Sequence, residues 1–523
     1  MKNFSSPINL FPIEMFFAVF LLSEPLSAQP TIEWQKALGG SESDLARCVQ
    51  QTMDGGYVVA GYTVSYNGDV VGNHGVNDFW VVKLSSTGMI QWKKALGGSN
   101  DDWAYSIQQS SDGGYLVTGY TKSTNGDVMS NHGDRDFWVV KLNSLGVIQW
   151  QKTLGGSDWD EAWSVRQTTD GGYIVAGRSR SSDGDVTTNH GGFDFWVVKL
   201  DDIGIIEWQK SLGGSMDDIA YSVRQTMDGG YIVTGESESN DGDASGLHGS
   251  SDYWVVKLSP AGALEWQKML GSTSIDRPND IYPTNDGGYI VAGIASLNNG
   301  DVTGNHGGFD YWVVKLDGLG EIEWQKSLGG SNQDYAQSIQ QTSDGGYVIA
   351  GSSPSTDGDV LGNDGGVDSW IVKLTNQGEI QWQKTLGGTQ TDRALSIRQS
   401  SDDGYILAGF TQSNNGDVSG FHGVQDYWVV KLSPESVSTK EDTPTAPLDI
   451  YPNPAQQFIN IKIPLPELAC SVSISDLLGR ELSRQTIANE GKVDIAALPN
   501  GLYIITATTP SGKLYSGKFI KLE

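Results

Sequence analysis

Cysteine and basic residues are scarce in this sequence of 523 residues. The two cysteines, Cys48 and Cys470, fall in segments assigned below to different domains, so we expect buried free thiols and no disulfide framework. Lysine and arginine number 34 against 63 acidic residues, which gives a net charge of −29. A field of this sign repels nucleic acid and anionic membranes, so no nucleic-acid partner is expected.

The sequence also lacks the asymmetric groupings that enzymes use. It has no Gly-x-Ser-x-Gly elbow, no phosphate-cradling glycine loop and no His-Glu-x-x-His helix. Most acidic residues recur at repeat positions instead of forming a pair in unlike environments. We therefore predict that the protein is not an enzyme.

No hydrophobic run has the length of a typical transmembrane helix. The run from Met15 to Leu22 has fewer than half of the about 20 apolar residues that such a helix needs. It follows Met1-Lys2 and precedes Leu26-Ser27-Ala28, a pattern that predicts a signal peptide over residues 1–28. The mature chain then carries no transmembrane segment; a single membrane anchor is the alternative.

What the sequence has in abundance is glycine, tryptophan and a repeat of 58 residues. Two sets of tryptophans keep this step, and they are Trp34, Trp92, Trp150, Trp208, Trp266, Trp324 and Trp382, and Trp80, Trp138, Trp196, Trp254, Trp312, Trp370 and Trp428. A fixed period in this range indicates a solenoid, a propeller or an array. The seven units run without an insertion or deletion.

Each unit alternates apolar and polar residues with period 2, which predicts strands. In the second unit we expect strands A to D at about Ala104 to Ser110, Tyr115 to Tyr120, Asp136 to Leu142 and Val147 to Leu154. A turn at Asp112-Gly113-Gly114 joins A to B. Seven four-stranded meanders predict an all-β, seven-bladed β-propeller over residues 29–432, with the tryptophans packed between blades.

The two ends of the repeat region are complementary. The chain begins with a lone D-type strand at Thr31 to Leu38, whereas the seventh unit has Lys440 where its D-strand tryptophan is expected. We predict that the first strand completes the last blade, because this pairing hydrogen-bonds the ends of the ring together. The strand order resembles that of WD40-type propellers in topology only. Segments such as Asp170–Gly177 and Phe137–Leu142 look more like propeller repeats of secreted bacterial proteins.

A second domain follows the ring. Residues 433–447 read as an exposed linker, and residues 448–523 hold several short β-patterns that predict a small β-sandwich. Three pieces of this tail, Ile450–Pro454, Asp476–Arg480 and Leu498–Tyr503, with the closing Lys518–Lys521, resemble the C-terminal sorting domain of the type IX secretion system of Bacteroidota. The resemblance implies that residues 448–523 engage that secretion machinery and that the protein is exported to the cell surface.

The loops between strands B and C carry a candidate metal site. All six histidines occupy one position in these loops, with Asp364 in the sixth unit, and aspartates flank them in every unit. Asp69, Asp78, Asp127 and Asp136 echo a calcium-binding loop, but no glutamate closes it and histidine suits hard cations poorly. We favour loops held by their own hydrogen bonds, with no cofactor, and keep calcium as the alternative.

The positions that differ between units are the informative ones. Aromatic and arginine side chains cluster from the end of strand D to the middle of strand A, a stretch that converges on one mouth of the channel. The candidate ligand-binding residues are Arg47, Trp103, Tyr105, Trp159, Trp163, Tyr221, Arg277, Tyr335 and Arg393. Exposed aromatics with a few arginines suit stacking on sugar rings or anchoring a protein partner. Tolerated variation at loop ends explains them equally well.

These observations favour a secreted or surface-attached binding or adhesion propeller with an extracellular glycan or protein as its partner. A structural component of a surface layer is the second hypothesis. An extracellular carbohydrate-active enzyme is the third, since fold does not fix function.

Overall fold

The computed structural model describes residues 27–363, 365–437, 446–462, 470–475, 481–487, 490–508 and 514–522. Two compact units divide the chain, one of them Gln29–Glu435 and the other Met1–Ala28 with Ser436–Glu523. Most of the predicted signal peptide, residues 1–26, and most of the predicted linker, residues 438–445, lie outside the described part. The described residues form strands, turns and loops; none of them belongs to a helix that could span a membrane.

The first unit consists of strands that repeat in the order A, B, C, D. The A strands are β3 (Asp44–Gln51), β7 (Asp102–Gln109), β11 (Asp160–Gln167), β15 (Asp218–Gln225), β19 (Arg277–Pro283), β23 (Tyr335–Gln341) and β27 (Asp392–Gln399). The B strands are β4 (Tyr57–Thr63), β8 (Tyr115–Thr121), β12 (Tyr173–Ser179), β16 (Tyr231–Ser237), β20 (Tyr289–Ala295), β24 (Tyr347–Ser353) and β28 (Tyr405–Thr411). The C strands are β5 (Asp78–Leu84), β9 (Asp136–Leu142), β13 (Asp194–Leu200), β17 (Asp252–Leu258), β21 (Asp310–Leu316), β25 (Asp368–Leu374) and β29 (Asp426–Leu432). The D strands are β6 (Ile90–Leu96), β10 (Ile148–Leu154), β14 (Ile206–Leu212), β18 (Leu264–Leu270), β22 (Ile322–Leu328), β26 (Ile380–Leu386) and β2 (Ile32–Leu38).

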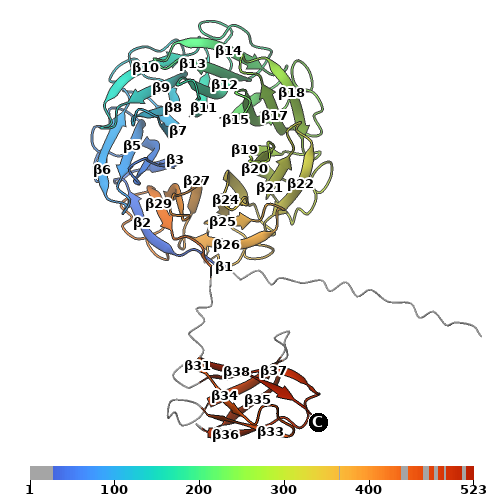
Figure 1. Ribbon diagram of the computed structural model, residues 1–523. Helices are drawn as coiled ribbons and strands as arrows, with labels where there is room; N and C mark the ends of the chain where they lie inside the picture. The colour runs from blue at the N-terminus through green and yellow to red at the C-terminus, as the bar shows by residue number, and fades with distance from the viewer. Residues whose placement is uncertain are drawn as a thin grey trace, which may run out of the picture. The chain divides into compact units, whose positions relative to one another are not determined.

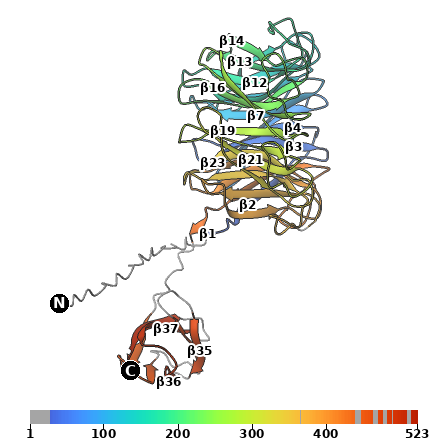
Figure 2. The same ribbon diagram turned by 90° about the vertical axis from the view of Figure 1, so that its right-hand side faces the viewer.

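These strands form seven four-stranded antiparallel sheets arranged as the blades of a propeller. Figure 1 shows the ring face-on, with the A strands innermost, and Figure 2 shows it from the side. The predicted strands are confirmed to within about two residues. Strand A of the second blade starts earlier than expected, at Asp102, because the Asp102 amide donates to the Asn77 carbonyl of the preceding blade at 2.7 Å.

The predicted ring closure is confirmed. β2 pairs with β29 in the register Ile32↔Leu432 to Leu38↔Tyr427, so the first strand is the outer strand of the last blade. The closed blade also repeats the side-chain bonds of the others. Trp428 Nε1 donates to Gln35 Oε1 at 2.9 Å.

Tryptophans hold neighbouring blades together, as predicted. The C-strand tryptophans are fully buried, and Trp138 packs on Phe79 of the preceding blade with ring centroids 4.5 Å apart. The D-strand tryptophans are mostly half-buried and meet a B-strand tyrosine of the next blade, as Trp92 meets Tyr115 at 5.5 Å. The D-strand contact recurs at all seven interfaces and the C-strand contact at six, with Ser369 replacing the aromatic ring at the seventh, so each interface has an aromatic contact. Cys48 is a buried free thiol, as expected.

The second unit holds two sheets around one core. A short pair, β1 (Ser27–Ala28) with β30 (Ser436–Val437), also belongs to it. One sheet has the order β31 (Ala446–Pro447), β38 (Leu514–Lys521), β37 (Gly501–Thr508), β34 (Cys470–Ser475) and β35 (Glu481–Ile487). The other has the order β32 (Asp449–Tyr451), β33 (Phe458–Lys462) and β36 (Glu490–Asp494). Ile459 of the smaller sheet and Ile505 and Phe519 of the larger one share the buried core, which is the predicted sandwich.

Candidate functional site

The predicted ligand-binding residues lie at or just before the start of the A strands. Two repeat positions supply most of them, and these positions hold Leu45, Trp103, Glu161, Ile219, Arg277, Tyr335 and Arg393, and Arg47, Tyr105, Trp163, Tyr221, Asn279, Gln337 and Leu395. We call this end of the channel, with the neighbouring Trp159, the variable mouth. Parallel bridges join the segments before strand A to the ends of the B-to-C loops, as Asn77 with Asp101, so both lie on one face.

A β-bulge in strand A shapes the mouth. In the second blade the register shifts between Ala104 and Ser106, which leaves Tyr105 as the extra residue. A bulge re-aims its side chain, and Tyr105 reaches Trp163 of the next blade. The partner strand carries a glycine here because a Cβ on Gly119 would lie 1.7 Å from the Trp103 carbonyl oxygen.

Aromatic side chains of four consecutive blades form one continuous stack at the mouth. Trp103 stacks on Tyr62 at 4.1 Å between ring centroids, and Tyr105 stacks on Trp163 at 4.3 Å. Trp163 meets Tyr221 edge-on at 5.1 Å, and Trp103 and Tyr105 lie 6.4 Å apart. The sequence predicts exposed aromatics, whereas these side chains are half-buried because they cover one another. Burial raises the pKa of Tyr105 to about 12.

Buried ion pairs fix the rim around this stack. Glu161 is 1% exposed and is paired with Arg135 and with Arg178, whose Nη2 lies 2.6 Å away. Glu236 accepts from Arg277 Nε at 2.6 Å and from the Tyr221 hydroxyl at 2.5 Å. A buried carboxylate with two donors is held in one geometry, so the rim is pre-shaped.

The remaining predicted residues lie at the mouth but outside the stack. Trp159 is covered by the Arg135 guanidinium at 4.1 Å and donates from Nε1 to Asp134 Oδ2 at 2.7 Å. The ring centroids of Tyr335 and Phe309 lie 5.8 Å apart. Arg47 lies over the Tyr105 ring at 5.3 Å, and Arg393 is half-buried. The structure thus joins Arg47, Trp103, Tyr105, Trp163 and Tyr221 in one cluster. Trp159 is linked to this cluster through Arg135, which also lies over Tyr120, the ring that stacks on Trp103.

The B-to-C loops are held by the hydrogen bonds that the loop hypothesis expects. Asp78 Oδ2 accepts from the backbone N–H of His74 at 2.7 Å and lies 2.9 Å from its Nδ1, and the other five histidines repeat the arrangement. Burial raises the pKa of Asp78, and hydrogen bonds from His74 oppose the shift. Asp364, the counterpart of the histidines in the sixth unit, lies outside the described residues.

The calcium candidates do not gather into one ligand set. Asp69 Oδ1 lies 3.7 Å from Lys93 Nζ, and Asp127 Oδ2 accepts from the Gly97 amide at 3.3 Å. Asp136 is bound to His132, as Asp78 is bound to His74. In the part of the chain that the structure describes, no three His, Cys, Asp or Glu side chains are grouped to hold a metal ion.

Chelation of calcium is expected to leave the melting temperature of the propeller nearly unchanged, because His74 and its counterparts already bond Oδ2 of the loop aspartates and the described residues group no three metal-ligating side chains. Ligand binding to the native state alone would instead raise stability as calcium is added. Melting curves with EDTA, with calcium and with sodium at equal ionic strength measure the difference. A large drop with EDTA that calcium reverses and sodium does not would contradict the expectation.

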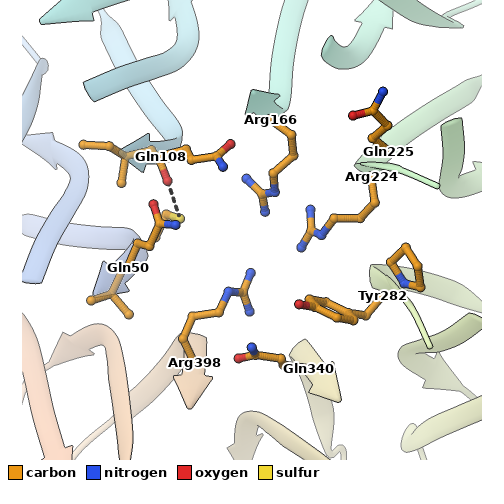
Figure 3. A pocket seen from close by; sticks show the side chains of 12 residues that line it. Gln50, Gln108, Arg166, Arg224, Gln225, Tyr282, Gln340 and Arg398 are labelled. Carbon is orange, nitrogen blue, oxygen red and sulfur yellow. Dashed lines mark hydrogen bonds between the residues drawn. The ribbon is translucent and has the colours of Figure 1, made fainter. Parts of the chain in front are cut away.

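Sequence reasoning missed a second variable ring near the other end of the A strands. The repeat position before the last residue of most A strands holds Gln50, Gln108, Arg166, Arg224, Tyr282, Gln340 and Arg398. These residues line a cavity of about 400 Å³ in the channel, where the three arginines point toward one another (Figure 3). Comparing the seven units at this position, as was done at the mouth, would have revealed it.

The C-terminal unit matches a known family. Residues 449–521 fit the family described as a secretion system C-terminal sorting domain. The unit is a type IX sorting domain. The protein is therefore exported and reaches the cell surface, as the sequence predicts.

In the sorting domain Asn453 holds the last strand, since its Oδ1 accepts from the Ile520 amide at 2.9 Å and its Nδ2 donates to the Lys518 carbonyl at 3.0 Å. The Asp476–Arg480 piece lies outside the described residues.

The propeller has distant relatives. The regulatory protein FlaEY of Caulobacter vibrioides is 22% identical over 438 residues, which are 73% of this chain and 45% of that protein. The chain thus spans about half the length of this curated relative.

Two solved structures are similar at 11% identity. The extracellular domain of a hybrid two component system from B. thetaiotaomicron aligns over 94% of this chain and 60% of its own, with a TM-score of 0.40. The WD40 domain of Pan2 from Neurospora crassa aligns over 76% of this chain and 95% of its own, with a TM-score of 0.43.

Proposed function

We propose that the propeller is a non-catalytic binding or adhesion module whose glycan or protein partner docks on the variable mouth. The aromatic stack of Trp103, Tyr105 and Trp163 carries this proposal. It occupies positions that differ between blades, in a ring whose strand tryptophans recur at a constant step of 58 residues. Variation at the mouth of a repeated scaffold is typical of a binding surface.

The geometry of the mouth suits recognition. Aromatic rings that already stack on one another lose little conformational freedom on binding, which makes them effective anchors. The buried pairs of Glu161 and Glu236 keep the rim in one shape before a partner arrives. Export by the sorting domain brings this surface to the outside of the cell, where glycans and proteins of other cells are available.

Replacing Trp103 and Trp163 by leucine is expected to weaken binding by roughly 10- to 100-fold, as the loss of an aromatic hot spot implies. Leucine stands at the equivalent positions of other blades, as Leu45 and Leu395, so the fold should tolerate it. A glycan array probed with the purified mature chain identifies the ligand, and titration of the best hits measures the affinity.

The matched control is Met129→Ala, which changes a side chain that is 85% exposed in a B-to-C loop of the same face. It should bind like the wild type. Equal binding by the double leucine variant and the wild type would exclude the mouth as the docking surface.

A structural surface-layer component is the second candidate, and exposed apolar side chains on the C-to-D turns favour it. Leu145 and Val147 in the second blade and Ile203 and Ile205 in the third are between 53% and 69% exposed. Self-assembly of the purified chain that is indifferent to the leucine substitutions, with no hit on the array, would favour this scaffold over the binding module. Turnover of a polysaccharide pool by the purified propeller would instead support the hypothesis of an extracellular carbohydrate-active enzyme.

A further inference from the structure

Three arginines meet at the end of the channel opposite the variable mouth. Arg166 of β11, Arg224 of β15 and Arg398 of β27 extend into the cavity from different blades, with their guanidinium groups directed at one another (Figure 3). Each of them donates to the carbonyl of the residue before it, as Arg224 Nη1 does to the Val223 carbonyl at 3.1 Å. Arg166 Nη1 donates to the Val165 carbonyl at 2.6 Å and Arg398 Nη1 to the Ile397 carbonyl at 2.6 Å.

One carboxylate, that of Asp280, pairs with two of the three guanidinium groups. Asp280 Oδ1 lies 2.8 Å from Arg224 Nη2, and Asp280 Oδ2 lies 3.7 Å from Arg398 Nη2. Arg166 donates to Ser106 Oγ at 3.2 Å, and among the described residues no carboxylate lies within ion-pair distance of it. The cluster therefore has three positive charges against one negative charge.

This imbalance is costly in a site shielded from water. Burial, together with the charges of Arg224 and Arg398, lowers the pKa of Arg166 to about 9. Burial also lowers the pKa of Arg224, although the charge of Asp280 opposes the shift. Buried charges without partners destabilise a protein, so a group that neutralises them would be bound favourably.

The arginines are not needed to close the ring. Where the same repeat position holds glutamine, the side chain links two blades, as Gln108 Oε1 accepts from the Gln167 amide at 2.7 Å and Gln340 Oε1 accepts from the Gln399 amide at 2.9 Å. A guanidinium group has no acceptor and cannot make this bond. Three blades thus carry a charge where three others carry a glutamine that links neighbouring blades.

We propose that this end of the channel binds a doubly charged oxyanion, either free sulfate or phosphate or the phosphate monoester of a small saccharide. Guanidinium groups match the oxygens of such anions with paired N–H donors. Gln50, Gln108, Gln340 and the Tyr282 hydroxyl line the same cavity and can donate to further oxygens. Two negative charges would balance the two positive charges that Asp280 leaves uncompensated.

Sodium sulfate and sodium phosphate are expected to raise the melting temperature of the mature chain more than sodium chloride does at equal ionic strength.

Arg166→Gln should weaken sulfate binding roughly 10- to 100-fold in calorimetric titration, as the loss of a charge-assisted hydrogen bond implies. Its melting temperature without sulfate should not fall, because glutamine can accept from the Gln225 amide as Gln108 does from Gln167.

Asp280→Ser should act in the opposite direction. Serine stands at the equivalent position of five other blades, so the backbone accepts it, but the variant leaves three arginines without a counter-ion. We expect a lower melting temperature without sulfate and a larger gain with it. Arg180→Gln, which removes the same charge from an exposed loop residue, should titrate like the wild type.

Two outcomes would overturn the proposal: equal effects of sulfate and chloride, or unchanged sulfate binding by Arg166→Gln. Glucose 6-phosphate and glucose distinguish the sources of the anion, because a sugar phosphate that binds more tightly than inorganic phosphate, beside glucose that does not bind, indicates the ester. The leucine variants of Trp103 and Trp163 should bind sulfate normally, so this test can fail or succeed independently of the function proposed for the mouth.

Discussion

Deleting residues 29–38 is expected to lower the free energy of unfolding of the propeller by more than the roughly 3–5 kcal/mol that truncating one buried tryptophan costs. The deletion removes β2, exposes the edge of β29 and opens the contact of Trp34 with Tyr57 of the first blade, whose ring centroids lie 5.7 Å apart. It also removes Gln35, the acceptor for Trp428. Both sides of the closure are lost at once, so the ring should open there.

Thermal and urea unfolding of the purified propeller measure this effect. Trp34→Ala and Trp92→Ala form a matched pair, because both indoles donate to a backbone carbonyl at 3.1 Å and pack on a tyrosine of the next blade. If β2 closes the ring in solution, the two substitutions should destabilise it equally. A harmless Trp34→Ala beside a costly Trp92→Ala would show that the closed blade is not formed.

Removing residues 448–523 is expected to abolish surface display while the propeller remains folded. The tail carries the sorting domain and belongs to a compact unit separate from Gln29–Glu435, so the ring keeps its own core and closing strand. The truncated protein should accumulate in the periplasm. Proteolysis of intact cells and immunoblots of cell fractions measure where it resides.

The retained protein must be shown to be folded for this result to concern sorting. Its melting temperature, measured after purification from the periplasm, should equal that of the propeller in the full chain. The control Met129→Ala in the full-length protein should reach the surface normally. Surface display of the truncated protein at the wild-type level would contradict a sorting role for residues 448–523.

Much of the candidate mouth could be predicted from the sequence, but its exposure could not. The repeat places Trp103 and Trp163 at the start of strand A, and ring closure brings those starts to one end of the channel. The alternation of apolar and polar residues shows which face of a strand a side chain occupies. It does not show which side chains of the next blade will cover that side chain. Because Tyr105 and Trp163 come from different blades, only the packed ring shows that they stack and leave each other half-buried.

The sequence by itself determined the number of blades, the pairing of β2 with β29 and the sorting domain. The number of blades and the sorting domain follow from a constant period and from local patterns, because six of the seven blades are built from strands adjacent in the chain and the tail pieces lie close together. The pairing of β2 with β29 follows from the lone D-type strand at the start of the repeat region and the missing D strand at its end. Only the tertiary structure decided that Arg166, Arg224 and Arg398 share one cavity with a single carboxylate, Asp280. Their charges meet through the curvature of the whole ring, and no local pattern records which side chains that curvature brings together.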